Sequence, residues 1–456
     1  MGKTKKAVKV VCSLIFALLV IAGVKPLQAD DSLKWFRGQL HSHTYWSDGR
    51  AFPEQAVDAY KQRGYQFLSM TDHNQFAEDT KNWREVKENE GTWPPNVTQT
   101  QFDDYVKTYG KDWVKIRNDE SGTSVRLKTY AEVKSKFEDP GSFILLPGVE
   151  LTQVLNGTHV HLNYINLPVS LPCIEEADLS LDMEEPAMTV SKLLALNASE
   201  TGQAALKLQK PYMLILNHPF WTYYDITPQN LIDCHEIYFF EICNGGIDYA
   251  PHPKALTYTV DKFWDIVNAF RLSQGKPLLY GIGSDDAHYY DEKRINDSSG
   301  VGDAWIMVRA AALTPEHLLA AMHRGDFYAS NGVFLENVVF TPGDNTLRVA
   351  VKAEPGVKYR INFITTKKGF DRTVTEIASP AEKNRPARTI PLYSDDIGRT
   401  VKTVAGTEAA YRLEADDLYV RAYVESDAPS KTAPYFHSKV KVAWTQPYID
   451  KGTPSK

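Results

Sequence analysis

Three stretches, WFRGQL at residues 35–40, PEQAVDAYKQR at 53–63 and YQFLSM at 65–70, decide the fold class of this chain. The first and third are apolar runs of strand length, and the second carries apolar residues at helical spacing. Pro53 suits a first helical turn and Gly64 suits a helix end, so the middle stretch is predicted to be a helix. The predicted order is therefore strand, helix, strand.

The same alternation continues to about residue 333 and predicts an α/β architecture. Helices placed between nearly continuous apolar strands indicate a parallel sheet or a barrel. Further strands are predicted at 143–149, 160–165, 213–216, 237–242 and 278–282, and further helices at 190–208 and 256–272.

Two stretches interrupt the alternation, and after Asn331-Gly332 the pattern changes. The insertions at 77–140 and 168–188 are predicted to lie over the active face. Beyond them, short strand-like runs with few helical patterns predict a small, sandwich-like all-β domain. The predicted division is a signal peptide at 1–29, an α/β barrel at 30–333 and the all-β domain at 334–456.

Composition limits the classes of function. The 456 residues carry a net charge of -6 with no long basic run, which argues against a nucleic-acid or membrane-surface partner. Four lysines before the apolar run at 10–24 predict a secretory signal peptide and a periplasmic or extracellular location. That run is short for a bilayer core of about 30 Å, so stable membrane insertion is not expected, although an uncleaved anchor is the alternative.

Cysteine usage does not suggest a disulfide framework. Outside the predicted signal, the chain has Cys173, Cys234 and Cys243, an odd number without zinc-knuckle or redox spacing. A pair between Cys234 and Cys243 stays open, but buried thiols acting as small apolar residues are favoured.

Histidines at the ends of apolar runs predict a metal site. Side chains two apart on a strand share one side, which pairs His41 with His43, His159 with His161 and Asp286 with His288. Glu150 closes the apolar run at 143–149, and the carboxyl ends of barrel strands line one mouth. Seven of the 12 histidines lie at such ends, namely His41, His43, His73, His159, His161, His218 and His288.

From 39 to 331 the chain resembles the polymerase and histidinol phosphatase (PHP) superfamily, and within it a branch similar to carbaryl-hydrolase-like metallohydrolases. The resemblance is carried by short motifs in a fixed order along the chain. These are His41-Ser-His43-Thr44 with Ser47-Asp48-Gly49, Thr71-Asp72-His73-Asn74, Gly148-Val149-Glu150, Asn217-His218-Pro219, Glu241-Ile-Cys-Asn244 and Gly283-Ser-Asp-Asp286-Ala-His288.

The resemblance implies a distorted seven-stranded β/α barrel with two or three divalent metals at its mouth. It implies one metal on His41, His43, Glu150 and His288. Glu150 would bridge to a second metal held by His218 and by either His159 or His161. A third would use His73 and Asp286, where the family often adds a histidine and this sequence offers Asp48.

Mixed imidazole and carboxylate ligands favour zinc, manganese or iron over an all-oxygen magnesium site. A water shared by two such cations would lose its proton near neutral pH and act as the nucleophile. Asp286 is also predicted to carry a proton to the leaving group, and Arg50 either to contact a phosphate or to be a solvated surface residue. The side chains predicted to orient the imidazoles are Asp72, Glu241, Asn244 and Asp285.

The sequence therefore predicts an exported metal-dependent hydrolase of small molecules, with a phosphoester as the favoured substrate. One alternative is a hydrolase of carboxylic or carbamic esters or of amides that uses the same metal site. Another is a non-catalytic glycan- or surface-binding protein. Specificity is predicted to lie in the two insertions and in aromatic residues near the proposed ligands, namely Tyr45, Trp46, Phe220, Trp221, Tyr223 and Tyr224. The sequence does not indicate an oligomeric state.

Overall fold

The structure is a computed structural model, and it describes residues 33–88, 92–155, 158–174, 188–220, 226–245, 259–290, 300–380, 387–430 and 439–450. The predicted signal peptide and most of the insertion at 168–188 lie outside these ranges, as do Trp221, Tyr223 and Tyr224. Among the described residues, no helix combines the length and the apolar character that a membrane crossing requires.

The predicted strand, helix, strand order opens the fold and is confirmed as β1 (Lys34–Gln39), α1 (Pro53–Gln62) and β2 (Phe67–Met70). The helix begins at Pro53, where the Gln55 side chain accepts a hydrogen bond of 3.0 Å from the backbone N–H of Phe52. Its apolar face is fully buried, which explains why helical spacing in this stretch was a reliable signal.

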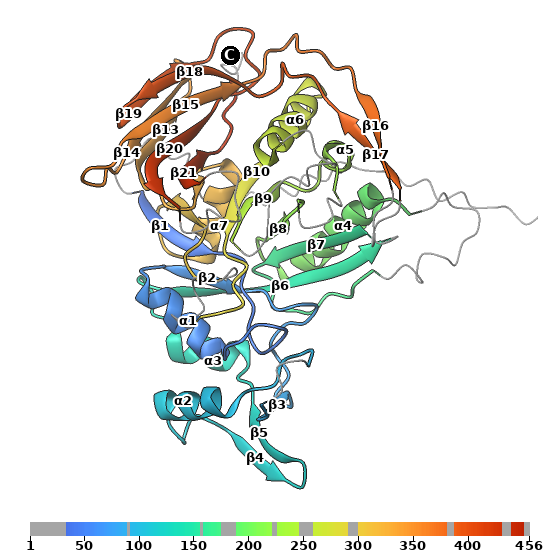
Figure 1. The fold of residues 1–456 in the computed structure, drawn as a ribbon, viewed down its shortest axis with the longest axis vertical. Coiled ribbons are helices and arrows are strands. Elements are labelled where there is room, and N and C mark those ends of the chain that lie inside the picture. Colours follow the sequence, from blue (N-terminus) through green and yellow to red (C-terminus); the bar gives the residue numbers. More distant parts are fainter. Residues whose placement is uncertain are drawn as a thin grey trace, which may run out of the picture.

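The largest sheet has 13 strands, and its hydrogen-bonded order joins both halves of the chain (Figure 1). From edge to edge it runs β10 (Tyr280–Ser284), β9 (Phe239–Asn244), β8 (Met213–Leu216), β7 (Thr158–Ile165), β6 (Ile144–Leu155), β2, β1, β11 (Trp305–Ala310), β12 (Phe327–Ser330), β21 (Val440–Thr445), β20 (Arg421–Pro429), β15 (Tyr359–Thr365) and β18 (Arg399–Ala405). The α/β class is confirmed. The ladder is continuous because β21 pairs with both β12 and β20, so it confirms neither the seven-stranded barrel nor a separate all-β domain.

The sheet is mixed, whereas a parallel one was predicted. The pairs β1/β2, β2/β6, β8/β9 and β9/β10 are parallel, but β6/β7, β7/β8 and β1/β11 are antiparallel. The physical reason is that β7 follows β6 after residues 156–157, and an antiparallel pair needs no crossover helix.

The first part of the sheet curls so that the segments after its strands meet. Ser42, just beyond β1, forms an isolated parallel bridge with Ala287, just beyond β10. The His43 backbone N–H donates to the Ala287 carbonyl at 2.8 Å. At Gly283 a Cβ atom would lie 2.6 Å from the Trp305 carbonyl oxygen, so glycine permits the close approach of β10 to β11. This curl brings the segment after β1 and the segment after β10, which carry the first and last predicted metal ligands, next to each other.

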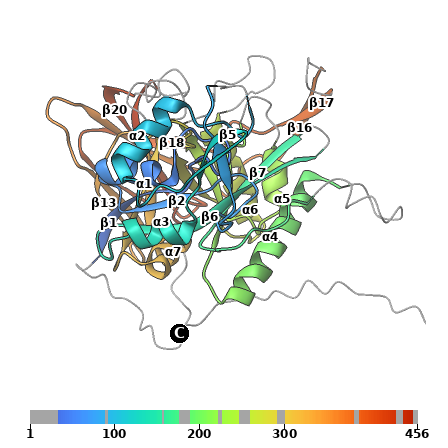
Figure 2. The same cartoon turned by 90° about the horizontal axis from the view of Figure 1, so that it is seen from below.

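Helices pack against this curled sheet, which Figure 2 shows from below. Besides α1, which packs on β2, they include α4 (Val190–Leu208), α5 (Pro228–Asp233), α6 (Val260–Ser273) and α7 (Pro315–Arg324). Leu193 and Leu194 of α4 pack in one apolar core with Phe263 and Trp264 of α6. The bounds of α4 agree with the predicted helix at 190–208.

The insertion at 77–140 forms its own small unit below the sheet in Figure 1. It contains β3 (Trp83–Glu85), α2 (Gln99–Tyr109), β4 (Ile116–Asp119), β5 (Gly122–Arg126) and α3 (Tyr130–Phe137), with sheet order β3-β5-β4. Tyr45 and Trp46, which follow the H-x-H motif, pack into the apolar core of this unit. The insertion therefore rests directly on the segment that carries the first predicted ligands.

After residue 334, the regular elements formed by the described residues are all β-strands. Besides the strands of the large sheet it contributes β13 (Leu335–Thr341), β14 (Thr346–Val351) and β19 (Glu408–Arg412), which form a three-stranded sheet, and the hairpin of β16 (Thr375–Ser379) and β17 (Arg388–Leu392). Arg421 of β20 reaches Asp265 of α6 with a fully buried, two-pronged ion pair. The three cysteines outside the predicted signal are free thiols.

Candidate metal centre

The predicted ligands lie where the strands of the curled sheet end. The segments after β1, β2, β8 and β10 each contribute, together with β6 and β7. A parallel bridge between His73 and Glu150 extends the β2/β6 ladder into the site. The donors brought together are His41 and His43 after β1, His73 after β2, Glu150 in β6, His161 in β7, His218 after β8, and Asp286 and His288 after β10.

Four buried donor atoms face one another at the centre of this group: His41 Nε2, His43 Nε2, Glu150 Oε2 and Asp286 Oδ1. The two imidazole nitrogens are 3.2 Å apart. Asp286 Oδ1 lies 3.2 Å and 3.1 Å from them, and Glu150 Oε2 lies 3.4 Å and 3.3 Å from them. All four side chains are almost completely buried.

His41 Nε2, His43 Nε2 and Asp286 Oδ1 form one candidate ligand group, and Glu150 forms another with His41 and His218. Zinc bonds of about 2.0–2.2 Å to nitrogen and oxygen place ligand atoms of one cation at separations of this size. Asp286 Oδ1 is buried and accepts no hydrogen bond from a described residue, and the buried Glu150 Oε2 lies 2.9 Å from His73 Nδ1. Buried carboxylate oxygens that face imidazole nitrogens in this way fit a divalent cation.

The tautomer of His41 agrees with this use. His41 Nδ1 lies 2.7 Å from Glu241 Oε1, which would hold the proton on Nδ1 and leave Nε2 as the donor atom toward a bound cation. Glu241 is itself held in place, because its Oε2 accepts hydrogen bonds of 2.8 Å from the His218 backbone N–H and from Asn244 Nδ2. The predicted orienting role of Glu241 thus has direct geometric support.

Glu150 presents its two oxygens to two different groups of imidazoles. Oε2 faces His41, His43 and, at 2.9 Å, His73 Nδ1, whereas Oε1 lies 3.2 Å from His161 Nδ1 and 3.5 Å from His218 Nε2. The rings of His161 and His218 are themselves edge to face, 4.9 Å apart. A carboxylate in this position fits the predicted bridge between two cations.

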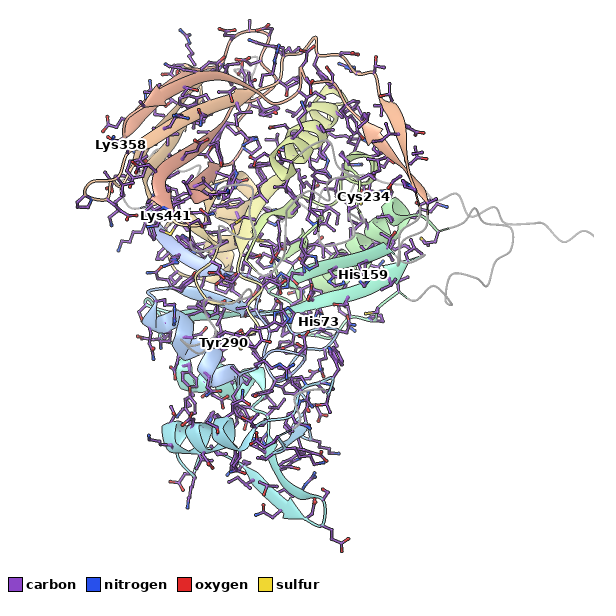
Figure 3. The ribbon with its side chains drawn as sticks, in the orientation of Figure 1. His73, His159, Cys234, Tyr290, Lys358 and Lys441 are labelled. Carbon is purple, nitrogen blue, oxygen red and sulfur yellow. The ribbon has the colours of Figure 1, made fainter. Side chains whose placement is uncertain are left out.

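The choice between His159 and His161 follows from the register of β6 and β7. In that ladder Glu150 pairs with Asn163, Thr152 with His161, and Val154 with His159. The partner of His161 in the ladder is therefore two residues from Glu150 along β6, and the partner of His159 is four residues away. His159 lies further out on β7 (Figure 3). The structure brings His161 to the bridging carboxylate, and it places His159 behind it at a ring distance of 5.7 Å.

A third group surrounds Asp48. Its Oδ1 lies 3.3 Å from His288 Nε2 and 3.5 Å from His73 Nε2. The His288 ring donates from Nδ1 to the Asp286 carbonyl at 2.8 Å, which leaves Nε2 as the donor atom toward Asp48. His43 lies between this group and the central one, with its ring 4.4 Å from that of His288.

The implied ligand sets stay predictions, and the donor groups overlap with them only in part. His288 lies with His43, as implied, and also with Asp48 and His73, whereas Asp286 lies with His41 and His43. The prediction treated Asp286 and His288 as residues on one strand face. β10 ends at Ser284, and Asp286 has a left-handed backbone with φ of 50°, so strand alternation does not apply between them.

Asp72 fixes the loop that carries the first ligands. Its Oδ1 accepts from the Thr44 backbone N–H and from Ser47 Oγ, both at 2.7 Å, and its Oδ2 accepts from Thr44 Oγ1 at 2.8 Å. Ser47 Oγ in turn lies 3.3 Å from His43 Nδ1. Asp72 thus orients His43 through Ser47 and does not touch the imidazole itself.

Three other predicted residues act differently from the expectation. The Asp285 carboxylate contacts no imidazole among the described residues; it accepts the backbone N–H groups of residues 302–304 and the Tyr60 hydroxyl, and so anchors the loop before β11. Asn244 orients two carboxylates, since its Nδ2 donates to Glu241 and, at 3.2 Å, to Asp286 Oδ2. Arg50 is tied to the site only by its backbone N–H, which donates to the His288 carbonyl at 2.7 Å.

The electrostatics favour bound cations. Burial alone would raise the pKa of Glu150, but the charges of His73 and His41 lower its pKa well below the ordinary value. The pKa of Asp286 is lowered in the same way, against its burial, by His41 and His43. Burial lowers the pKa of His161 to about 4, and a neutral imidazole is the form that binds metal.

Sequence reasoning did not identify two buried asparagines that hold the bridging carboxylate. Asn217 Nδ2 donates to Glu150 Oε1 at 2.8 Å and to Asn163 Oδ1 at 2.9 Å, and Asn163 donates to the Leu40 carbonyl at 3.1 Å. The spacing of both residues from predicted ligands was a usable signal. Asn163 lies two residues from His161 on the same strand face, and Asn217 directly precedes His218.

No protein-family model matches the chain, and no curated protein is similar to it in sequence at a significant level. Three solved structures are similar at low levels. One is a two-domain protein from Bacteroides vulgatus containing a predicted PHP-like metal-dependent phosphoesterase, at 12% identity, TM-score 0.37, and coverage of 93% of this chain and 97% of that one.

The second structure is a candidate metal-dependent phosphoesterase from Bifidobacterium adolescentis, at 12% identity and TM-score 0.30 over 56% of this chain and 88% of that one. The third is an amidohydrolase from Chromobacterium violaceum with bound sulfate, at 13% identity and TM-score 0.27 over 55% and 87%. PHP-like phosphoesterases are thus among the structural neighbours. At TM-scores this low the similarity carries no argument about the chemistry of this chain.

Proposed function

We propose that this protein is a metal-dependent phosphoesterase that acts on small molecules. One observation carries the proposal: Glu150 presents one oxygen to His41 and His43, which also face Asp286, and the other oxygen to His161 and His218. Two cations held by a shared carboxylate are the arrangement used in hydrolytic displacement at phosphorus.

Divalent cations bound here would supply an acidified water molecule and neutralise the charge on substrate oxygens. The residues of the chain position those cations. His41, His43 and Asp286 would hold one, and His161 and His218 the other. Asp48, His73 and His288 offer a third position. Glu241, Asn244, Asp72 and Asn217 keep the donors fixed through their hydrogen bonds. Zinc, manganese and iron suit such a donor set.

Asp286 and Arg50, the two residues predicted to act on the substrate, are each proposed to have one role. Asp286 directs Oδ1 at the imidazoles and takes the Asn244 amide on Oδ2, which supports a ligand role rather than a proton-carrying one. The Arg50 guanidinium makes no hydrogen bond or ion pair with a described residue, which leaves it available for an anionic substrate.

The test combines metal analysis with a substrate panel. Protein loaded with manganese or zinc is expected to contain at least two ions per chain and to release phosphate from aryl phosphate mono- or diesters. His43→Ala should lose metal and activity together, whereas His317→Ala, at an exposed helix position, should keep both. Turnover of aryl carbamates or carboxylic esters without phosphate release would reassign the reaction. Less than one ion per chain under metal loading would favour a binding protein.

We further propose that the chain is exported, on the basis of the lysines and apolar run in residues 1–29. Cell fractionation tests this, with a variant in which the apolar run is interrupted by two arginines as the control. Enzyme found in the cytoplasmic fraction at full length would contradict it.

A further inference from the structure

The insertion at 77–140 forms a cleft beside the metal-binding group. The cleft has a volume of about 560 Å³ and is lined mainly by residues 79–84, by Trp46 and Ser47 from the loop after β1, and by Trp93 and Arg117. Ser47 belongs both to this lining and to the metal-binding group, where its hydroxyl lies 3.3 Å from His43 Nδ1. The cleft therefore opens directly beside the proposed reaction centre.

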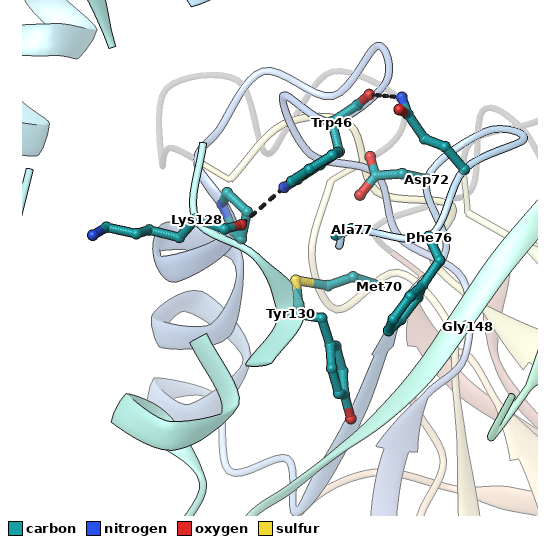
Figure 4. A pocket seen from close by; sticks show the side chains of 10 residues that line it. Trp46, Met70, Asp72, Phe76, Ala77, Lys128, Tyr130 and Gly148 are labelled. Carbon is teal, nitrogen blue, oxygen red and sulfur yellow. Dashed lines mark hydrogen bonds between the residues drawn. The ribbon is translucent and has the colours of Figure 1, made fainter. Parts of the chain in front are cut away.

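Hydrogen bonds hold in place the wall of the cleft that lies nearest the predicted metal ligands. Trp46 is buried, its indole N–H donates to the Lys128 carbonyl at 2.9 Å, and its own carbonyl accepts from Gln75. Both bonds are drawn in Figure 4, which shows a second pocket that Trp46 also lines. Arg84 also donates to backbone carbonyls here, at 2.8 Å to Tyr45 and at 3.3 Å to Trp46. A wall held in this way can determine the shape of a bound ligand.

Two tryptophans offer flat faces in the cleft. Trp93 is 70% exposed, a high fraction for the largest apolar side chain, and its ring centre lies 6.5 Å from that of His73. Trp83 is half-buried, and the Arg117 guanidinium is stacked over it at 4.9 Å. Exposed aromatic rings next to a polar site are suited to stacking on a planar group.

The cleft is also positively charged, in a chain whose net charge is -6. The hydrogen bonds of Arg84 go to neutral oxygens, namely two backbone carbonyls and the Asn82 side chain, so no described carboxylate pairs with its charge. Lys81 is exposed and forms no ion pair with a described residue. Asp79 is the one carboxylate among the described lining residues. Such cations favour an anionic ligand.

We propose that this cleft binds the leaving group of the substrate, and that this group is a flat ring carrying a second anionic substituent. The inference rests on the proposed function and extends it to a substrate class. The hydrolysed ester would lie at the metal-binding group, the ring against Trp93, and the second anion toward Lys81 and Arg84. The reaction itself is ordinary ester hydrolysis, in which water supplies an oxygen to phosphorus and the P–O bond to the ring breaks.

Turnover is compared on four phosphate monoesters, measured by phosphate release from the manganese-loaded, full-length protein. The esters differ in two features of the leaving group, a flat ring and a second anionic substituent. Methyl phosphate has neither, phenyl phosphate has only the ring, phosphoglycolate has only the second anion, and 4-carboxyphenyl phosphate has both. We expect 4-carboxyphenyl phosphate to exceed phenyl phosphate and phosphoglycolate in kcat/KM by about tenfold or more. A preference for methyl phosphate, or a kcat/KM for 4-carboxyphenyl phosphate no higher than that for phenyl phosphate or phosphoglycolate, would overturn the proposal.

Binding without turnover separates this inference from the proposed function. The probe is 4-(phosphonomethyl)benzoate, which cannot be hydrolysed, and its Kd is measured by calorimetry. Trp93→Ala should raise the Kd about tenfold, Trp93→Phe should restore most of the affinity, and Lys81→Gln should raise it about threefold. Lys358→Gln, the same change at an exposed position remote from the cleft, is the matched control (Figure 3).

The two failures have different signatures. If no phosphoester is turned over but the probe binds and Trp93→Ala weakens it, the proposed reaction fails and the ligand class stands. If phosphoesters are hydrolysed but Trp93→Ala and Lys81→Gln bind the probe as the wild type does, the cleft is not the leaving-group site.

Discussion

His41 Nδ1 and Glu241 Oε1 are 2.7 Å apart in a fully buried position, which fixes the imidazole proton on the side away from the metal-binding group. Glu241→Gln should remove the charge that holds this tautomer and lower metal affinity about 10- to 100-fold. Competitive titration against a chelating dye measures the effect. Glu376→Gln, at an exposed strand position, should have the wild-type affinity. An unchanged affinity in Glu241→Gln would show that the carboxylate does not support the ligand.

The two oxygens of Glu150 predict a difference in metal count between two variants. Glu150→Gln should disturb both groups that share this carboxylate and lower the metal content by about two ions per chain. His218→Ala should disturb only the group on Oε1 and lower it by about one. Elemental analysis after gel filtration gives the count. Equal losses in the two variants would contradict the bridge.

Glu54 predicts part of the pH dependence of stability. Burial raises its pKa above the usual 4.5, although Tyr105 and Trp113 donate hydrogen bonds of 2.7 Å and 2.6 Å to its Oε1. The folded state therefore holds this proton more tightly than the unfolded state. Its stabilising effect is complete below pH 4.5 and is lost as the pH rises through the raised value.

Glu54→Gln should consequently gain stability relative to the wild type as the pH increases from about 4.5 to 8. Urea unfolding at several pH values measures this difference, and because metal ligands titrate in both proteins, their contribution cancels. A difference that stays constant or shrinks with rising pH would rule out a raised pKa.

The Asp265–Arg421 pair predicts a large loss on removal of one partner. Arg421 Nη2 and Nε donate to the two Asp265 oxygens at 2.6 Å and 2.8 Å, and Tyr419 donates to the same carboxylate at 2.7 Å. Asp265→Ala leaves the buried guanidinium with the partly exposed Asp261, at 3.3 Å, as its carboxylate partner and should lower the free energy of unfolding by about 3 kcal/mol. The double variant with Arg421→Met should recover part of this loss. Equal destabilisation in the single and double variants would contradict charge burial as the cause.

The sequence predicted the site well where strands end regularly. Period-two alternation placed His41 with His43, and the apolar run before Glu150 placed that carboxylate correctly between imidazoles. It did not predict that Asp286 lies beside His41 and His43, because a left-handed residue beyond the strand end turns the next side chains, and the spacing of residues in the sequence does not specify that φ.

The fold was predictable at the level of class and helix bounds, but not at the level of pairing. Helical spacing located α4 to the residue, since an amphipathic pattern is local. The antiparallel pairing of β7 with β6, and the joining of β12 to β21, depend on contacts between distant segments. The role of Asp285 was wrong for a similar reason, because its partners at 302–304 lie on a loop that only the folded chain brings near.

The placement of β21 between β12 and β20 has a consequence for biosynthesis. During translation β12 is made before β13 to β20, whereas β21, the strand that pairs with its edge, is made after them. Until then β12 exposes unpaired backbone groups, the kind of edge to which another nascent chain can bind. Premature termination before residue 440 would therefore be expected to yield an aggregating product rather than an active fragment, even though every proposed metal ligand would already have been synthesised.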